Sequence, residues 1–210
     1  MKLALFYDTE TTGLPLFKEP SEHPAQPHLV QPGARLVDLD SRDIINTLDV
    51  VIRPEGWDIP DDVSAIHGIT TEKAMAVGVP EPLALRMLLE MWESAGERIG
   101  HNEPFDARLI RIAQHRFGLA DSELEAWKSG PSQCTQIMAT PILKLPPTEK
   151  MLKAGFNKHK SANLGEAYEF FTGRKLVNAH SALADVDACM AVFFAVQDGV
   201  RERVTLPLAA

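Results

Sequence analysis

Cysteine is scarce in this chain, and long apolar runs are missing. The 210 residues include only Cys134 and Cys189, whose separation fits neither a metal-binding pair nor a disulfide framework. No stretch approaches the roughly 20 apolar residues of a membrane-spanning helix. The first apolar run ends at Asp8, too early for a secretory signal peptide. We therefore expect a cytoplasmic protein with reduced thiols and no membrane contact.

Positive charge is also in short supply. The chain has 21 Lys and Arg against 29 Asp and Glu, a formal net charge of −8. This balance argues against a protein that coats nucleic acid by electrostatic attraction. It leaves open an enzyme that grips the end of a strand through bound cations. With 45% apolar and 24% charged residues, the composition suits one globular domain, expected over residues 1–210.

Strand patterns come first along the chain, and helical patterns follow. Residues 2–9 alternate as a strand with apolar side chains on both faces. Residues 35–39 and 44–53 are predicted as an antiparallel hairpin, and the proline-rich stretch 13–32 as an exposed loop. A short strand is expected at 98–100. This order indicates an α/β architecture, a mixed sheet with helices on its faces.

The helices are predicted from their caps and apolar stripes. Thr70 is a candidate N-cap, and Asn163 with Glu166 has the spacing of a capping box. A helix over 103–117 carries proline in its first turn, where proline is tolerated. The last helix is predicted over residues 182–197, with Gly199 ending it.

Two acids stand at the end of the first strand. Because alternate side chains of a strand share a face, Asp8 and Glu10 project to the side that carries Ala4 and Phe6. Two like charges beside an apolar face are costly unless a cation or a shared proton compensates them. The alternative is that the strand ends before them and that both carboxylates are solvated. Taken alone, the pair favours neither interpretation.

Two further acids fall on the inward faces of helices. Asp106 lies on the apolar stripe of its helix, although a first-turn aspartate can also serve the helix dipole. Asp185 is four residues before Cys189 on the buried face of the last helix, whereas Asp187 lies about 200° around and should face solvent. His180 just precedes this helix. A single histidine there is more often ordinary surface, so its weight comes from the neighbouring acids.

Four inward acids without a matching set of inward Lys or Arg indicate divalent cations. Oxygen ligands without cysteine favour Mg²⁺ or Mn²⁺. Two such ions about 4 Å apart would clamp a phosphodiester, one generating hydroxide and the other stabilising the leaving 3′-oxygen. A nearby histidine can accept the proton of the attacking water. The residues thus predict metal-dependent hydrolysis of a phosphodiester.

These residues occur in three ordered motifs, which are Asp8–Gly13, His101–Asp106 and His180–Asp185. With them the sequence resembles the DEDDh group of 3′→5′ exonucleases, which includes the proofreading subunit of the bacterial replicative polymerase and ribonuclease T. The segment Ile66–Thr70 also looks like one common in this group. The resemblance runs from Leu3 to about residue 196.

The resemblance implies an RNase H-like fold, a five-stranded mixed sheet flanked by helices, as one exonuclease domain. It implies that four carboxylates hold two Mg²⁺ or Mn²⁺ ions and that a histidine is the general base. These catalytic residues are Asp8, Glu10, Asp106 and Asp185, with His180 as the base. Substrate contacts are implied for Thr9, Thr11, Leu14, His101, Asn102 and Phe105, with Leu14 as a wedge against the terminal base. Ordinary core packing is the alternative for Leu14 and Phe105.

The direction of attack also comes from the resemblance. It implies removal of nucleoside monophosphates from the 3′ end of single-stranded DNA. An exoribonuclease or oligoribonuclease that trims RNA is one alternative. A catalytically silent nucleic-acid-binding module is another, and it predicts the loss of at least one of the five site residues, all of which are present. A homodimer and a polymerase partner both stay open.

Two segments depart from the motifs. The proline-rich segment 15–32 follows directly on Leu14. Segment 144–160 carries five lysines around Phe156. Lysines beside an aromatic ring could follow a single-stranded backbone, and a solvated loop is the alternative.

Overall fold

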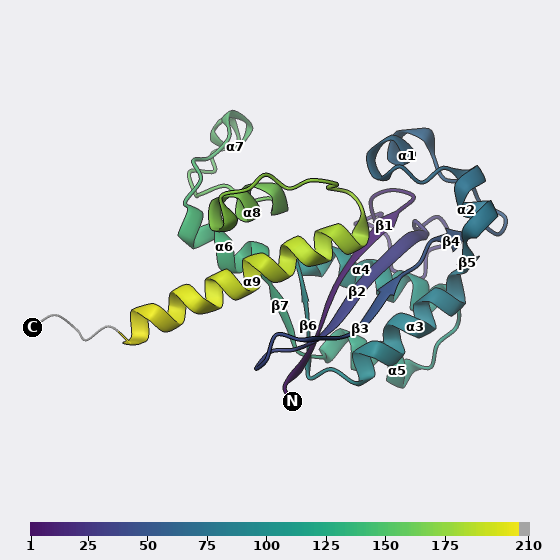
Figure 1. Ribbon diagram of the computed structural model, residues 1–210. Coiled ribbons are helices and arrows are strands. Elements are labelled where there is room, and N and C mark those ends of the chain that lie inside the picture. Colours follow the sequence, from purple (N-terminus) through teal and green to yellow (C-terminus); the bar gives the residue numbers. More distant parts are fainter. Residues whose placement is uncertain (206–210) are drawn as a thin grey trace, which may run out of the picture.

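A five-stranded mixed sheet forms the centre of the molecule (Figure 1). The computed structural model describes the backbone of residues 1–205 and the side chains of residues 1–199. The strand order is β3-β2-β1-β6-β7. The strands are β1 (Leu3–Thr11), β2 (Leu29–Asp38), β3 (Ile44–Asp49), β6 (Glu97–Gly100) and β7 (Ser132–Cys134). The first three pair antiparallel, whereas β1, β6 and β7 run parallel. The expected mixed sheet is confirmed.

Helices cover both faces of this sheet (Figure 1). One face carries α3 (Glu81–Glu93), α4 (Glu103–Arg116) and α5 (Asp121–Ser129). The other carries α6 (Thr135–Leu143), α8 (Leu164–Thr172) and α9 (Ala182–Thr205). The shorter elements are α1 (Asp61–His67), α2 (Thr71–Val77), α7 (Glu149–Lys153) and the paired strands β4 (Ile52–Arg53) and β5 (Val79–Pro80). Within the described residues, no helix combines the length and apolar character needed to cross a bilayer.

The central strand β1 is buried on both faces, as its sequence predicts. Leu5 and Tyr7 join the core beneath α3, α4 and α5. Ala4 and Phe6 pack on the opposite side under α9, where the Phe6 ring meets Phe193 edge to face at 5.3 Å. Fully burying one large apolar side chain contributes about 1.5–3 kcal/mol. The apolar contacts of β1 therefore fix the sheet between its two helical layers.

Two of the predicted helix caps are confirmed. The Thr70 side chain accepts a hydrogen bond from the Lys73 amide at the start of α2. Asn163 and Glu166 form the predicted capping box at the start of α8, with bonds of 2.8 and 2.9 Å. Each cap satisfies amide groups that the first helical turn leaves without a backbone partner.

Three predicted boundaries are wrong. The loop predicted over residues 13–32 ends earlier, because Leu29 and Val30 are buried in β2 despite the nearby prolines. The strand predicted over 44–53 divides after Asp49, since the chain leaves the main sheet and β4 pairs with β5 instead. Gly199 does not end the last helix, which continues to Thr205. A glycine in a helix costs only about 1 kcal/mol, so it need not stop one.

Gly33 allows α9 to lie close against β2. It pairs with Asp8 in the sheet register. A Cβ atom at Gly33 would come within 2.6 Å of the Ala182 carbonyl carbon and 2.7 Å of the Leu183 nitrogen. Only glycine fits this approach, because the obstructing atoms belong to backbone. The start of α9 is thereby brought next to the end of β1.

We expect Gly33→Ala to destabilise the protein by about 1–3 kcal/mol, because overpacking must displace the start of α9. Gly96→Ala is the matched control, since its added Cβ would meet only the Leu3 carbonyl oxygen at 3.5 Å. Urea unfolding measures both free energies. Equal stability of the two variants would show that the close approach at Gly33 is not required.

Candidate active site

Asp8 and Glu10 belong to the sheet. Because β1 continues to Thr11, the interpretation in which the strand ends before the two acids is wrong. Both residues are half-buried, and they follow Phe6 on the side of the sheet that α9 covers. The C-terminal ends of the parallel strands β1, β6 and β7 meet at this edge. Two adjacent carboxylates are therefore held at the margin of the apolar core.

The start of α9 brings a histidine and a third carboxylate to the same edge. Ligand atoms of Glu10, His180 and Asp185 all lie within 4.8 Å of one another. His180 has a left-handed backbone (φ 68°), and its amide donates to Asp185 Oδ2 at 3.1 Å. This local bond fixes the turn before α9. Residues separated by some 170 positions in sequence thus form one cluster.

Asp106 approaches from α4, as its helical phase predicted. Its carboxylate is 3% exposed, and Oδ1 accepts from the Thr9 amide at 3.1 Å and the Thr9 hydroxyl at 2.7 Å. Because Thr9 lies between Asp8 and Glu10, these two bonds tie α4 to the end of β1. All four predicted carboxylates therefore come from elements that meet at one edge of the sheet.

Burial and mutual repulsion disfavour the charged forms of these carboxylates. Burial raises the pKa of Asp8 well above its usual value, and the charges of Asp106, Asp185 and Glu10 raise it further. Burial also raises the pKa of Glu10 to about 7, with a second contribution from Asp185. The pKa of Asp106 is raised to about 7 by burial, although the bonds from Thr9 oppose the shift. In residues 1–199, no Lys or Arg forms an ion pair with these acids.

The donor set fits divalent cations. Asp185 Oδ1 is buried without a hydrogen-bond partner, which is costly for a carboxylate oxygen unless a cation binds it. Burial raises the pKa of Asp185, whereas the bond from the His180 amide lowers it. Carboxylate oxygens without a thiolate ligand are the donors preferred by Mg²⁺ and Mn²⁺. The residues present can hold such ions and offset their mutual repulsion.

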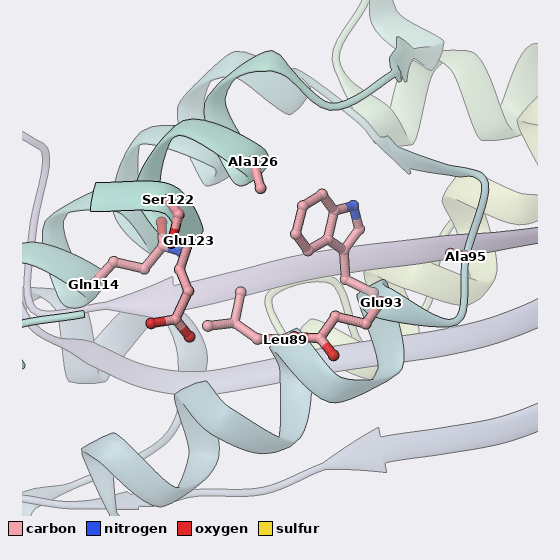
Figure 2. Close-up of a pocket in the computed structure, with 8 residues that line it drawn as sticks. Leu89, Glu93, Ala95, Gln114, Ser122, Glu123 and Ala126 are labelled. Atoms are coloured by element: carbon pink, nitrogen blue, oxygen red, sulfur yellow. The ribbon is translucent and has the colours of Figure 1, made fainter. Parts of the chain in front are cut away.

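Open space adjoins this cluster. A pocket of about 560 Å³ is lined by Asp185 and His180, the start of α8 and Lys175. A different pocket, of about 340 Å³, lies between α3, α4 and α5 and is lined by Leu89, Glu93 and Gln114 (Figure 2). That second pocket contains none of the clustered acids. Of these two pockets, the one beside α8 and α9 therefore adjoins the acids.

The other residues predicted to bind substrate have mixed surroundings. His101 is held by hydrogen bonds on both ring nitrogens. Nε2 donates to the Ala162 carbonyl at 3.0 Å. In a neutral ring Nδ1 then accepts, here from the Thr135 hydroxyl at 2.9 Å. Burial lowers the pKa of His101, in keeping with a neutral ring. Asn102 has a left-handed backbone at the start of α4, and Phe105 packs partly into the core. The bonds of His101 fix the chain between β6 and α4.

The loop after β1 carries Leu14, the residue predicted to act as a wedge against the terminal base. Leu14 is 71% exposed, so core packing does not explain it. Thr11 is buried, and its hydroxyl donates to the Gly13 carbonyl at 2.8 Å. Asp187 is exposed as predicted and pairs with Arg35 at 3.0 Å, which separates it from the four clustered acids.

Two further features lie near this site: His67, which belongs to the segment Ile66–Thr70 that the sequence singled out, and an ion pair that no sequence pattern predicted. Burial lowers the pKa of His67, a bond with the Thr11 backbone opposes the shift, and the charge of His180 lowers the pKa further, so His67 interacts electrostatically with the site. The other is a buried ion pair between Arg98 Nε and Glu103 Oε1 at 2.7 Å, to which the Tyr7 hydroxyl donates at 2.9 Å. An arginine inside an apolar strand was the available signal for this pair. The ion pair positions the elements that carry Asp8 and Asp106.

Two of the five lysines of segment 144–160 form ion pairs. Lys160 pairs with Glu166 at 2.5 Å, and the exposed Lys153 pairs with Glu149 at 3.9 Å. Lys158 lines a pocket of about 790 Å³ formed by α6 and the segment before α8. That these lysines follow a nucleic-acid backbone stays a prediction.

The fold is similar to that of exonuclease I. E. coli exonuclease I with a dT13 oligonucleotide has a TM-score of 0.73 and 20% identity, over 97% of this chain and 42% of that chain. The zinc-bound E. coli exonuclease I–single-stranded DNA complex gives 0.70 and 20%, over 97% and 42%. A third exonuclease I structure gives 0.69 and 22%, over 94% and 41%. This chain thus spans less than half the length of these proteins, and the likeness confirms the RNase H-like fold.

A search among curated proteins gave no match. The family model described as an exonuclease, that of RNase T, matches residues 5–193. This range includes all three motifs and every one of the clustered acids. The chain therefore belongs to the RNase T exonuclease family, as its DEDDh residues indicated.

Proposed function

We propose that this protein is a metal-dependent 3′→5′ exonuclease that releases nucleoside monophosphates from single-stranded DNA. The observation that carries the proposal is the convergence of Glu10, His180 and Asp185 beside Asp8, with the buried Oδ1 of Asp185 left without a partner. The oligonucleotide complexes of exonuclease I support single-stranded DNA as the substrate class.

The carboxylates divide between two metal positions in this proposal. Asp8, Glu10 and Asp185 would hold one Mg²⁺ or Mn²⁺ ion, and Asp8 and Asp106 would help to hold the second. When bound, such ions supply a nucleophilic hydroxide and stabilise the leaving oxygen. Thr9 keeps Asp106 aimed through its two hydrogen bonds. The whole chain would act as one exonuclease domain.

His180 is the proposed general base. Its ring is exposed beside the pocket and lies within the same 4.8 Å cluster as Glu10 and Asp185. An imidazole in this position can take the proton of an attacking water, and the nearby carboxylates stabilise the imidazolium that forms. The bond from the His180 amide to Asp185 fixes the backbone from which the ring projects.

The activity is tested with 3′-terminal degradation assays. Single-stranded DNA, duplex DNA and RNA labelled at the 5′ end are incubated with Mg²⁺, Mn²⁺ or EDTA. We expect stepwise shortening of single-stranded DNA that EDTA and Asp8→Asn both abolish. Asp187→Asn is the matched control, since this exposed acid pairs with Arg35 outside the cluster. Internal cuts, or activity in EDTA, would contradict the mechanism, and faster loss of RNA would favour the exoribonuclease.

His180→Ala should retain metal binding but lose about 10²-fold or more in kcat, the usual contribution of a positioned general base. Manganese affinity is measured by calorimetry, and kcat by single-turnover cleavage. His115→Ala, on the far end of α4, controls for the removal of an imidazole. An equally large loss of manganese affinity would make His180 a metal ligand instead.

Without metal, the stability of the folded protein should fall as the pH rises from about 4.5 to 7. The folded-state pKa of Glu10 is raised from 4.5 to about 7, so in this window the folded chain binds more protons than the unfolded chain. Thermal unfolding in EDTA should show a smaller decline for Glu10→Gln than for the native chain. Added Mn²⁺ should restore stability increasingly toward neutral pH, because it binds the ionised carboxylates. Parallel pH profiles of the two chains in EDTA would remove Glu10 as the cause.

A further inference from the structure

The pocket of about 560 Å³ beside the acidic cluster reaches the start of α8. Asp185 and His180 belong to the cluster, whereas Leu164 lies in the first turn of α8. Lys175, on the segment that joins α8 to α9 (Figure 1), lines the same pocket. Sites for small ligands typically measure about 300–1,000 Å³, so this pocket has room for more of a substrate than its scissile phosphate. A basic side chain therefore shares one pocket with the proposed general base.

The ammonium group of Lys175 has no partner among the described side chains. In residues 1–199, Lys175 forms no ion pair, and its side chain makes no hydrogen bond. Glu169 lines the same pocket, yet no ion pair joins it to Lys175. Lys175 is exposed, so its charge is available to a ligand that enters the pocket. An anion can thus bind Lys175 without breaking an existing contact.

The first turn of α8 adds donors of the same sign. The first amides of a helix have no partner inside it, and they give its N-terminus a partial positive charge. The capping box of α8 satisfies the amides of Glu166 and Asn163, at 2.8 and 2.9 Å. Leu164 and Gly165, whose amides it does not reach, both line the pocket. Lys175 supplies the full charge, and these amides support it.

We propose that Lys175 binds the substrate phosphate next to the scissile one, on the 5′ side of the penultimate nucleoside. This inference rests on the proposed function and names how the same site selects substrates by length. The scissile phosphate would lie at the metal ions beside His180, so the next phosphate along the strand is the nearest other anion. A lysine suits this contact, because its ammonium group binds a phosphate as a point charge from any direction.

The charge of the molecule explains why this phosphate needs a partner. Bound cations would offset the scissile phosphate together with the acids, whereas the next phosphate has no such ion. The chain carries a net charge of −8, so its average field repels a nucleic-acid strand. One unpaired lysine in the pocket offsets this repulsion at a single position. Lys175 is therefore a specificity-determining residue, which favours substrates that carry a second phosphate.

Two dinucleotides isolate the contact. The dinucleotide dTpdT carries the scissile phosphate alone, whereas pdTpdT also carries a phosphate at its 5′ end. We expect the native chain with Mg²⁺ to cleave pdTpdT with a kcat/KM about 10-fold higher, mainly through KM, as for one hydrogen bond to a charged group. Lys175→Gln should lose this preference and cleave dTpdT normally, and Lys175→Arg should keep it. Arg174→Gln is the matched control, since Arg174 is an exposed neighbour outside the pocket lining.

Binding gives a readout that does not depend on hydrolysis. The affinity for a labelled single-stranded oligothymidine is measured by anisotropy at several salt concentrations, in the Asp8→Asn background, in which we expect no cleavage. Adding Lys175→Gln should weaken binding and reduce the slope of log affinity against log salt by about 0.7, the value for one phosphate contact on a single strand. Adding Arg174→Gln should leave that slope unchanged.

The outcomes distinguish this inference from the proposed function. Equal cleavage of the two dinucleotides by the native chain, or the same preference in Lys175→Gln, would overturn the phosphate contact and leave the exonuclease standing. Lys175-dependent binding without hydrolysis of either dinucleotide would keep the contact and defeat the nuclease mechanism. Slower cleavage of both dinucleotides by Lys175→Gln, with a lower melting temperature, would show that Lys175 only supports the fold, and this too would overturn the inference.

Discussion

Repulsion among buried carboxylates is the constraint around which the rest of the molecule is arranged. Burial and like charges raise the pKa values of Asp8 and Glu10, and within residues 1–199 no basic side chain pairs with either acid. Without other contacts, the carboxylates at such an edge would move apart or become protonated. It is instead held by contacts that come from outside the cluster. Thr9 fixes Asp106, and the close approach at Gly33 sets α9 beside β1.

A buried ion pair provides part of this support. Arg98 and Glu103 are each about 4% exposed, and the Tyr7 hydroxyl donates to the same carboxylate oxygen. Arg98 also donates to the Trp127 carbonyl at 2.6 Å and lies over its ring. Removing one partner of a buried pair costs about 3–5 kcal/mol, because the other charge remains. The pair joins β1, β6 and the start of α4, the elements that deliver Asp8 and Asp106.

Local periodicity was sufficient to select the acids of the site. The features that it could not predict depend on long-range contacts. Helical phase placed Asp106 and Asp185 inward and Asp187 outward, because the turn of a helix depends on sequence spacing alone. The start of β2 could not be found in this way, since burial of Leu29 outweighed the local proline signal. The electrostatic interaction between His67 and His180 depends on how α1 and the turn before α9 are brought together, which no local pattern encodes.

The loop after β1 shows why polarity alone is a poor guide to burial. A glutamine among five prolines favours a solvated loop when only the sequence is considered. The folded chain buries Gln26 and uses both ends of its amide as backbone partners. An ordered loop can then hold an exposed aromatic ring such as Phe17 without losing its conformation.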